Sequence, residues 1–397
     1  MTDFAATRAA FDLPEGVVYL DGNSLGPLPQ GAAERAATVL RDEWGRMLIT
    51  AWNRAGWMAA PARVGARIGR LVGAAPGTIT MGDTLSVKIF QALAAGLALR
   101  PGRRVVLSDS GNFPTDLYMA QGLLRMLRQG HELRIVPPEA VAGALSDEVA
   151  ALLLTHVDYR TGRMHDMAGL TRAARDAGAV AIWDLAHSAG AVPVDLAGSG
   201  AEFAAGCTYK YLNGGPGAPA FIYVRPDLAD TIEPALAGWL GHAAPFAFEP
   251  DYRPAPGVER MRVGTPPVLQ MAVLDAALDV WDGVAMADIR ARSVALSERF
   301  VAGVAAACPA LTLASPPDPV ARGSQVSFRH ENGYAIIQAL IARGVIGDFR
   351  APDILRFGIA PLYVGTAEID RAIDALAEVM ARAAWDRPEF HARAAVT

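Results

Sequence analysis

The chain has 397 residues, with 36 Lys and Arg against 41 Asp and Glu, so its formal net charge is −5. With 52% hydrophobic and 19% charged residues it is too apolar for a disordered protein. The nearly neutral balance argues against a nucleic-acid-binding protein, which would carry a basic face. Only two of the basic residues are lysines, Lys88 and Lys210. Chemistry that needs an amine side chain therefore has two candidates.

The sequence also bears on the cellular compartment. Residues 1–16 have neither the basic start nor the apolar core of a signal peptide. No uncharged apolar run reaches the ~18 residues that a membrane helix needs. Two cysteines, Cys207 and Cys308, cannot form a disulfide framework and suit a reducing cytosol. We therefore expect a cytoplasmic protein that binds neither membranes nor nucleic acids.

From about residue 63 to residue 267, short apolar runs alternate with helical stretches. The helical stretches include 117–128 and 167–177. The runs predicted as strands are 104–107, 133–136, 151–155, 180–183 and 221–224. Apolar strands separated by helices are typical of a mostly parallel sheet that is buried on both faces. The pattern predicts an α/β domain whose ligands bind beyond the carboxyl ends of the strands.

The pattern changes after Pro266 and Pro267. There the sequence predicts a long helix, a strand, a helix, a strand-like stretch and a terminal helix, at 268–307, 324–329, 334–343, 345–359 and 366–385. This order is typical of a smaller α+β domain. The first 45 residues fit neither pattern, and we assign them to the smaller domain. We thus expect a large domain of residues 46–270 and a small domain of residues 1–45 and 271–397.

The most informative segment surrounds Lys210. Asp184 ends a predicted strand, and His187 follows three residues later. Lys210 comes after Tyr209 and precedes a glycine-rich turn at 214–217. Apolar and aromatic neighbours favour the lowered pKa that a Schiff-base lysine requires. An acid placed against a pyridinium nitrogen keeps that nitrogen protonated, so the residues together describe a pyridoxal-phosphate site.

Simpler interpretations compete with this one. A strand-end aspartate is more often a helix cap, and a lysine beside glycines is usually a solvated loop residue. Composition alone therefore does not decide between a cofactor site and these structural roles. Lys88 has no acid and aromatic residues of this kind near it, and we read it as an ordinary helix residue. Just before it, Asp83, Thr84 and Ser86 are residue types that cap helices. That helix start could bind a phosphate, although capping alone would also explain it.

Several motifs resemble the kynureninase family of pyridoxal-phosphate-dependent enzymes, in its bacterial form. They are YLDGNSLG at 19–26, FPTD at 113–116, WDLAHSAG at 183–190, CTYKYLNGGPG at 207–217, WLGH at 239–242 and RFG at 356–358. The resemblance implies fold type I, with a seven-stranded-type sheet between helices and a smaller α+β domain. It implies hydrolytic Cβ–Cγ cleavage of L-kynurenine to anthranilate and L-alanine in tryptophan catabolism. It also implies a homodimer in which both subunits complete each active site.

The resemblance assigns roles residue by residue. It implies that Lys210 binds the cofactor covalently, that Asp184 pairs with the pyridinium nitrogen, and that Tyr209 contacts the cofactor phosphate. As a separate hypothesis, Tyr209 donates a proton in the later steps of the reaction. The other residues implied to contact pyridoxal 5′-phosphate are Leu85, Ser86, Phe113, Pro114, Thr115, Asp116, Thr155 and His187, with Trp239 and Thr265 from a second subunit. Arg356 is implied to bind the α-carboxylate of the substrate through a bidentate ion pair. The other residues implied to contact the substrate are Trp52, Asn23 and Gly264.

Two positions qualify this picture. Leu85 stands where bacterial members often have a hydroxyl residue, but a backbone contact would survive that change. Thr265 matches the bacterial pattern, whereas the animal-type enzymes carry Asn there and favour the 3-hydroxylated substrate. The resemblance therefore points to L-kynurenine.

Three alternatives stay open. A related enzyme of the class V aminotransferase type, such as a cysteine desulfurase, would need a mobile catalytic cysteine. A non-catalytic pyridoxal-phosphate-binding sensor would carry a DNA-binding module, which no segment resembles. A metal site could involve His156, Asp158, His165 and Asp166, but their spacing matches no standard ligand set, and we predict none.

Overall fold

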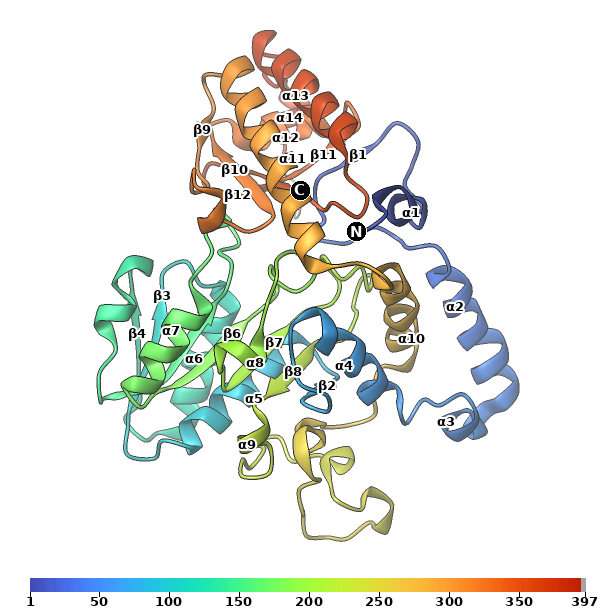
Figure 1. Ribbon diagram of the computed structural model, residues 1–397, viewed down its shortest axis with the longest axis vertical. Coiled ribbons are helices and arrows are strands. Elements are labelled where there is room, and N and C mark those ends of the chain that lie inside the picture. Colours follow the sequence, from blue (N-terminus) through green and yellow to red (C-terminus); the bar gives the residue numbers. More distant parts are fainter. Residues whose placement is uncertain (394–397) are drawn as a thin grey trace.

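A seven-stranded sheet forms the centre of the larger unit in the computed structural model, which describes residues 1–393 (Figure 1). Its strand order is β2-β8-β7-β6-β5-β3-β4, and only β8 runs antiparallel to its neighbours. The strands are β2 (Ile79–Met81), β3 (Val105–Asp109), β4 (Glu132–Val136), β5 (Val149–Thr155), β6 (Val180–Asp184), β7 (Phe203–Gly206) and β8 (Phe221–Val224). The predicted mostly parallel α/β sheet is confirmed.

The sequence predicted five of these seven strands. The two that it missed, β2 and β7, have three and four residues, and β7 reads Phe-Ala-Ala-Gly. β2 is too short to show an alternating pattern, and β7 contains no β-branched residue, so both lack the signal by which a strand is recognised.

Helices cover both faces of this sheet. Ile182 packs into one apolar cluster with residues of α5 and α6, whereas its neighbour Trp183 packs into another with residues of α4 and α7. Side chains that alternate along a strand point to opposite faces, so the sheet is buried on both sides. These helices, with the two short ones of this unit, are α4 (Ala60–Leu71), α5 (Leu85–Ala98), α6 (Pro114–Leu127), α7 (Met167–Asp176), α8 (Leu196–Ser199) and α9 (Pro226–Ala229).

The smaller unit contains a four-stranded antiparallel sheet in the order β12-β13-β10-β9. Its elements, with those that lead into it, are α10 (Val268–Ala277), α11 (Met286–Ala307), β9 (Thr312–Leu313), β10 (Gln325–Arg329), α12 (Gly333–Ile341), β11 (Val345–Ile346), β12 (Asp348–Arg350), β13 (Ile354–Gly358), α13 (Thr366–Ala381) and α14 (Pro388–His391). The predicted small-domain residues 394–397 lie outside the described residues.

Two predicted elements of this unit are divided. The long helix 268–307 breaks between α10 and α11, where Gly283 has φ +76°, a left-handed conformation that glycine adopts without strain. The stretch 345–359 forms three strands, because a turn at Asp353 reverses the chain between β12 and β13.

The N-terminal segment contacts both units. Its elements are α1 (Phe4–Ala9), β1 (Val18–Tyr19), α2 (Ala32–Thr38), a π-helix (Val39–Met47) and α3 (Ala51–Arg54). β1 pairs in parallel with β11 of the smaller unit, and α2 packs against α10. The backbone N–H of Gly26 donates to the carbonyl of Tyr209 in the larger unit (2.8 Å). In Figure 1 the α2–α3 arm projects from the side of the molecule.

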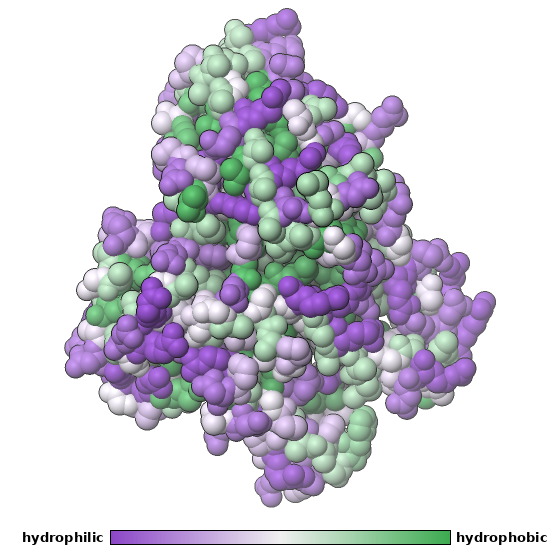
Figure 2. All heavy atoms as spheres, in the orientation of Figure 1, coloured by the Kyte–Doolittle hydropathy of each residue, from purple (hydrophilic) through white to green (hydrophobic). Residues whose placement is uncertain are grey.

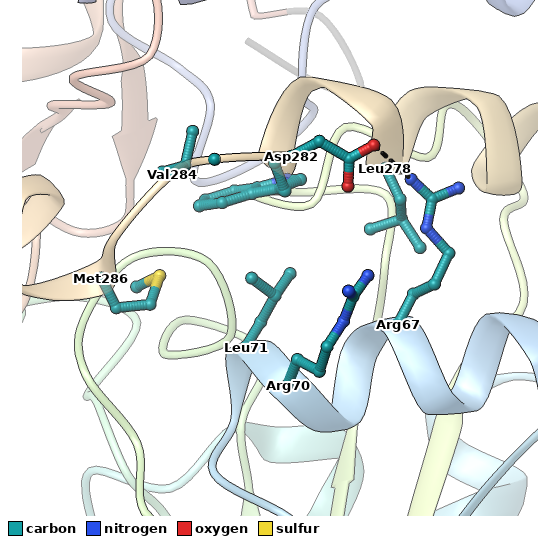
Figure 3. A pocket seen from close by; sticks show the side chains of 9 residues that line it. Arg67, Arg70, Leu71, Leu278, Asp282, Val284 and Met286 are labelled. Atoms are coloured by element: carbon teal, nitrogen blue, oxygen red, sulfur yellow. Dashed lines mark ion pairs between the residues drawn. The ribbon is translucent and has the colours of Figure 1, made fainter. Parts of the chain in front are cut away.

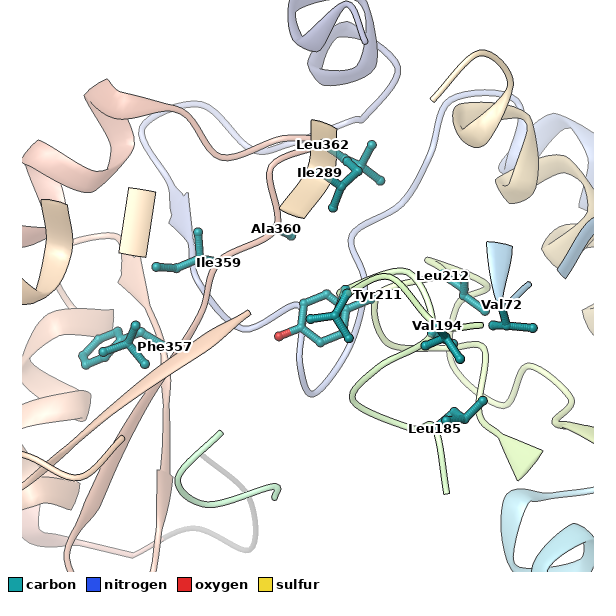
Figure 4. Packing of buried hydrophobic residues seen from close by; sticks show 14 of the residues in the cluster. Val72, Leu185, Val194, Tyr211, Leu212, Ile289, Phe357, Ile359, Ala360 and Leu362 are labelled. Carbon is teal, nitrogen blue, oxygen red and sulfur yellow. The ribbon is translucent and has the colours of Figure 1, made fainter. Parts of the chain in front are cut away.

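One apolar cluster joins the two units. Leu185, Tyr211 and Leu212 come from the larger unit, and Phe357 and Leu362 from the smaller one (Figure 4). Each large apolar side chain that is fully buried contributes roughly 1.5–3 kcal/mol, so this shared core holds the two units together. Within residues 1–393, no helix combines the length and the apolar character that a bilayer crossing requires.

Candidate active site

The site begins at the carboxyl edge of the large sheet. Thr155 ends β5 and Asp184 ends β6, and the two residues are paired in register. Both side chains are buried. The Thr155 hydroxyl donates to the carbonyl of Val157 (3.1 Å), and an Asp184 carboxylate oxygen accepts from the backbone N–H of Ala186 (2.8 Å). The backbone just after β6 therefore fixes the position of one Asp184 carboxylate oxygen.

A second buried acid adjoins Asp184. Asp116 lies in the first turn of α6, and its side chain is hydrogen-bonded to that of Asp184. Burial and the neighbouring carboxylate raise the pKa of Asp116 well above its usual range. Burial raises the pKa of Asp184 to about 6, although the positive Lys210 opposes the shift. Asp184 is therefore the more readily ionised member of the pair.

Lys210 faces this acidic edge from the loop after β7. Its amine donates to Nε2 of His187 across 2.9 Å. The amine lies 6.0 Å from the centre of the Phe113 ring and 5.7 Å from that of Tyr209. Burial and the Lys210 charge lower the pKa of His187 well below its usual range, so the imidazole is neutral and accepts the hydrogen bond. The structure thus brings the predicted lysine, acid, histidine and aromatic rings together.

The other lysine has a structural position. Lys88 is fully buried, and its amine donates to Asp83 Oδ2 (3.0 Å), Gln91 Oε1 (2.9 Å) and the carbonyl of Met261 (3.2 Å). These bonds tie the start of α5 to the 3₁₀ turn Gly257–Met261. All three of its hydrogens have acceptors, so Lys88 has none left for a ligand.

The start of α5 lies ahead of this lysine. Thr84 precedes the helix in an extended conformation and makes no side-chain capping bond. Leu85 and Ser86 occupy the first turn of this 14-residue helix and are half-buried. Backbone N–H groups in a first turn have no partner within the helix, and together with the helix dipole they suit a phosphate.

The smaller unit contributes an arginine. Arg356 is buried on β13, where its Nε donates to Asp348 Oδ1 (2.7 Å) and its Nη2 to the same carboxylate. Nη2 also donates to Ser24 Oγ (2.8 Å), and Nη1 donates to the carbonyl of Tyr159 (2.5 Å). The ring of Tyr159 contacts Phe113 edge-on at 5.1 Å. Tyr159 therefore connects Arg356 to the site around Lys210.

Asn23 is fully buried, and neither of its amide atoms has a protein partner among residues 1–393. It lies against Gly358, where a Cβ would come within 2.0 Å of Asn23 Oδ1. Buried polar atoms are rarely left unpaired in folded proteins, so this amide is available to a ligand.

Four predicted residues lie apart from this group. Trp52 packs against Trp57 on the α2–α3 arm, with ring centres 5.5 Å apart. Trp239, Gly264 and Thr265 are exposed. Within residues 1–393, no hydrogen bond, ion pair or ring contact joins these four residues to Lys210. Figure 1 shows the segment around residue 240 projecting below the sheet, away from the smaller unit.

Comparison with known proteins places the chain in a family. A model of the kynureninase C-terminal domain matches residues 289–376. A kynureninase of Pseudomonas fluorescens is 49% identical over 400 residues, which cover 99% of this chain and 96% of the relative. One of Burkholderia pseudomallei (strain K96243) is 50% identical with the same coverage. The chain belongs to the kynureninase family.

Solved structures show how widely this fold is shared. A mutant of C-DES with glycine covalently linked to its PLP cofactor superposes with a TM-score of 0.82 and 22% identity, over 95% of this chain and 100% of that one. A cysteine desulfurase from Thermococcus onnurineus NA1 superposes with a TM-score of 0.80 and 18% identity, over 96% and 99%. At such identities the likeness concerns the fold, which is the fold type I predicted from the motifs.

Sequence reasoning missed residues that this family member places beside Arg356. Asp348 and Arg350 stand two residues apart on β12, so their side chains share a face of the strand, and Asp348 lies directly opposite Arg356. The alternation Asp-Phe-Arg before the Arg-Phe-Gly motif was the available signal. Ser24 lies within a recognised motif but had no role assigned. The pairing of β12 with β13 is what reveals the cluster of Asp348, Arg350 and Arg356.

A separate pocket of about 310 Å³ lies between α4 and the segment 278–286 (Figure 3). Its labelled side chains include Arg67, Arg70 and Asp282, with the Arg67–Asp282 ion pair at 3.7 Å. Arg67 also pairs with Asp275 (2.9 Å) and Asp279 (2.7 Å). This pocket contains none of the predicted site residues.

Proposed function

We propose that this protein hydrolyses L-kynurenine to anthranilate and L-alanine, with pyridoxal 5′-phosphate bound at Lys210. Its identity of about 50% to kynureninases over nearly the whole chain supports the reaction. The grouping of Lys210, His187, Asp184 and Asp116 at one sheet edge is the observation that carries the proposed site.

The residues present fit this cofactor. The paired acids Asp184 and Asp116 share a buried site, and Asp116 Oδ2 has no protein partner among residues 1–393. A protonated ring nitrogen is the kind of group that such an acid pair stabilises. Pyridoxal 5′-phosphate supplies, when bound, an electron-withdrawing ring that stabilises negative charge on an attached amino acid.

Further residues are proposed to hold the rest of the cofactor. Phe113 would cover the ring, and His187 would lie beside it. The first turn of α5, with Leu85 and Ser86, would take the phosphate. The remaining predicted contacts are Pro114, Thr115, Thr155, Tyr209, Trp239 and Thr265.

Two side chains move protons in the proposed reaction. The Lys210 amine would hold the cofactor until the substrate's amine displaces it, and would then take the proton from Cα and return it to Cα before alanine leaves. Water adds to the γ-carbonyl carbon of the substrate, the Cβ–Cγ bond breaks, and Cβ takes up a proton. Burial raises the pKa of Tyr209 above its usual range, so its phenol stays protonated and is our candidate donor to Cβ. Each turnover consumes one water and releases one anthranilate and one alanine.

A second copy of the chain is proposed to complete each site. Trp239 and Thr265 are exposed and stand apart from Lys210 in one chain. Phe246 and Phe248, on the same projecting segment as Trp239, are also exposed, and Figure 2 shows hydrophobic atoms on the segment that projects at the bottom of the view. Exposed aromatic groups of this size are typical of surfaces that a partner covers. A homodimer would bring Trp239 and Thr265 to the partner's cofactor.

The desulfurase alternative receives no support from the cysteines. Cys207 and Cys308 are both buried. Burial raises the pKa of Cys207 to about 11, which disfavours the thiolate that a catalytic cysteine needs. We propose that the enzyme acts in the cytoplasm, on L-kynurenine in preference to 3-hydroxykynurenine.

A substrate panel tests this function. Purified holoenzyme is given L-kynurenine, 3-hydroxykynurenine or L-cysteine, and the release of anthranilate, 3-hydroxyanthranilate or sulfide is measured. The proposal expects the highest kcat/KM with L-kynurenine and no sulfide. Sulfide release with inert L-kynurenine would replace it with the desulfurase alternative, and cofactor absorbance without turnover of any substrate would favour the sensor.

A further inference from the structure

The donors of Arg356 are largely taken up by the protein. A guanidinium has five N–H groups. Asp348 accepts from Nε and Nη2, Ser24 from Nη2, and the Tyr159 carbonyl from Nη1. One Nη1 hydrogen remains, and the side chain is only 2% exposed. Arg356 alone cannot form a bidentate pair of hydrogen bonds with a substrate carboxylate while its guanidinium is bound to Asp348.

A second guanidinium stands beside it and reaches solvent. Arg350 Nη2 pairs with the same carboxylate, Asp348 Oδ2, at 2.8 Å, and lies 3.3 Å from Ser24 Oγ. Its Nη1 donates to the carbonyl of Phe349 (2.9 Å). These bonds leave its Nε–H and one Nη1 hydrogen without a protein acceptor within residues 1–393. The side chain is 35% exposed.

Contacts connect Arg350 to the lysine site. Arg350 shares Asp348 with Arg356, Arg356 donates to the carbonyl of Tyr159, and the Tyr159 ring contacts Phe113. The positive charge of Arg350 acts on both His187 and Tyr209, which flank Lys210. The strand pairing explains the position of Arg350, because Asp348 and Arg350 share a face of β12 and Asp348 lies opposite Arg356 on β13. Two guanidinium groups thus share the Asp348 carboxylate at the edge of the site, and their charge exceeds that of Asp348 as long as the nearby Asp21 is protonated.

We propose that Arg350 is a second substrate-binding residue, which receives the substrate's α-carboxylate together with the remaining N–H of Arg356. This inference rests on the proposed function, because it assigns a part of the same substrate. Asp348 pairs with both guanidinium groups, and each of them keeps an N–H without a protein acceptor within residues 1–393. Charge-assisted hydrogen bonds of this kind are the strong ones in proteins.

A pair of ligands that differ only in the carboxylate tests the assignment. 3-Benzoylpropionate has the aryl ketone chain and the carboxylate but no amine, and butyrophenone replaces the carboxylate with a methyl group. Both are measured as competitive inhibitors of the holoenzyme and of Arg350→Gln. The proposal expects Arg350→Gln to raise the Ki of 3-benzoylpropionate by about 10- to 100-fold, the size of one charge-assisted hydrogen bond. The Ki of butyrophenone should stay within twofold.

The control is Arg329→Gln. Arg329 lies on β10 of the same sheet and pairs with Asp353 (3.0 Å) at the surface. It should leave both Ki values unchanged. If Arg350→Gln left the Ki of 3-benzoylpropionate unchanged, the role of Arg350 would be overturned. The proposed function would still stand, provided that the unaltered enzyme turns over L-kynurenine. A rise in both Ki values would also overturn the role of Arg350, because that result means a general distortion of the pocket. Inert L-kynurenine with the unaltered enzyme would instead reject the proposed function.

Discussion

At the scale of single residues, the environment decides what each ionisable group can do. The chain has two lysines, of which Lys88 is fully buried and Lys210 is half-buried. Lys88 has three protein acceptors and joins two segments, whereas Lys210 has a neutral histidine, two aromatic rings and a nearby acid pair. A lysine amine therefore has a structural role at position 88 and is a candidate nucleophile at position 210.

Asp21 gives a pH prediction at this scale. Burial and the nearby Asp348 raise its pKa to about 7, against the lowering effects of Arg356, Arg350 and Ser24. As the pH rises through this value, Asp21 gains a negative charge beside the two arginines and repels a carboxylate ligand. The affinity for 3-benzoylpropionate should therefore be highest below pH 6 and fall by roughly 3- to 10-fold towards pH 8, as about 1 kcal/mol of repulsion predicts.

The Asp21→Asn variant isolates this effect. It cannot ionise at this position, so the change in Ki for 3-benzoylpropionate centred near pH 7 should be absent. The ionisation of Asp184 near pH 6 is common to both proteins. The charges of Asp348, Arg350 and Arg356 and the tyrosines near Asp21, which are Tyr19, Tyr211 and Tyr363, are the same in both proteins. If the variant and the parent showed the same pH dependence, another group would be responsible.

At the scale of elements, the site is the meeting point of strand ends. β5 and β6 end in Thr155 and Asp184, the start of α6 supplies Asp116, and β12 and β13 supply the arginine cluster. The parallel strands and the Asp184–Lys210 motif could be predicted from the sequence, because a run of apolar residues and a local motif are written in consecutive positions. The pairing of Asp348 with Arg356 could not, since it depends on how two strands align.

Gly358 shows how closely two elements approach. It pairs with Asp21 across an isolated bridge, and a Cβ at this position would lie 2.0 Å from Asn23 Oδ1. Gly358→Ala should therefore lower the free energy of unfolding by about 1–3 kcal/mol, as overpacking does. Urea unfolding followed by circular dichroism measures it.

The matched control is Gly122→Ala on α6. A Cβ at Gly122 meets nothing within 4 Å, so the change should stabilise the helix by about 0.5–1 kcal/mol. Equal unfolding midpoints for the two variants would mean that Asn23 moves aside freely and that residues 21–23 do not pack tightly against β13.

At the scale of the whole molecule, the proposed site extends over two copies of the chain. The sequence-based domain boundaries at residues 46 and 270 stay a prediction, since one apolar cluster runs through both units. The predicted roles of Trp239 and Thr265 also stay predictions, and they need a second copy. A sequence resemblance can name such residues, but a single chain cannot bring them to Lys210.

Complementation tests the shared site. Lys210→Ala and Trp239→Ala are each expected to be nearly inactive as homodimers. When the two variants are co-expressed with different tags, each heterodimer should contain one intact site and one doubly altered site. Random pairing then restores about a quarter of the activity of the unaltered enzyme. If the isolated heterodimer were as inactive as its parents, each site would be built from one chain alone.

The central claim is that Lys210 carries cofactor-dependent cleavage of L-kynurenine. Anthranilate fluorescence and the visible absorbance of the lysine-bound cofactor are recorded for the unaltered enzyme, Lys210→Ala and Lys88→Met. We expect stoichiometric anthranilate from the unaltered enzyme, loss of both signals in Lys210→Ala, and both signals retained in Lys88→Met, whose unfolding free energy falls by about 2 kcal/mol. Retention of both signals in Lys210→Ala would contradict the claim.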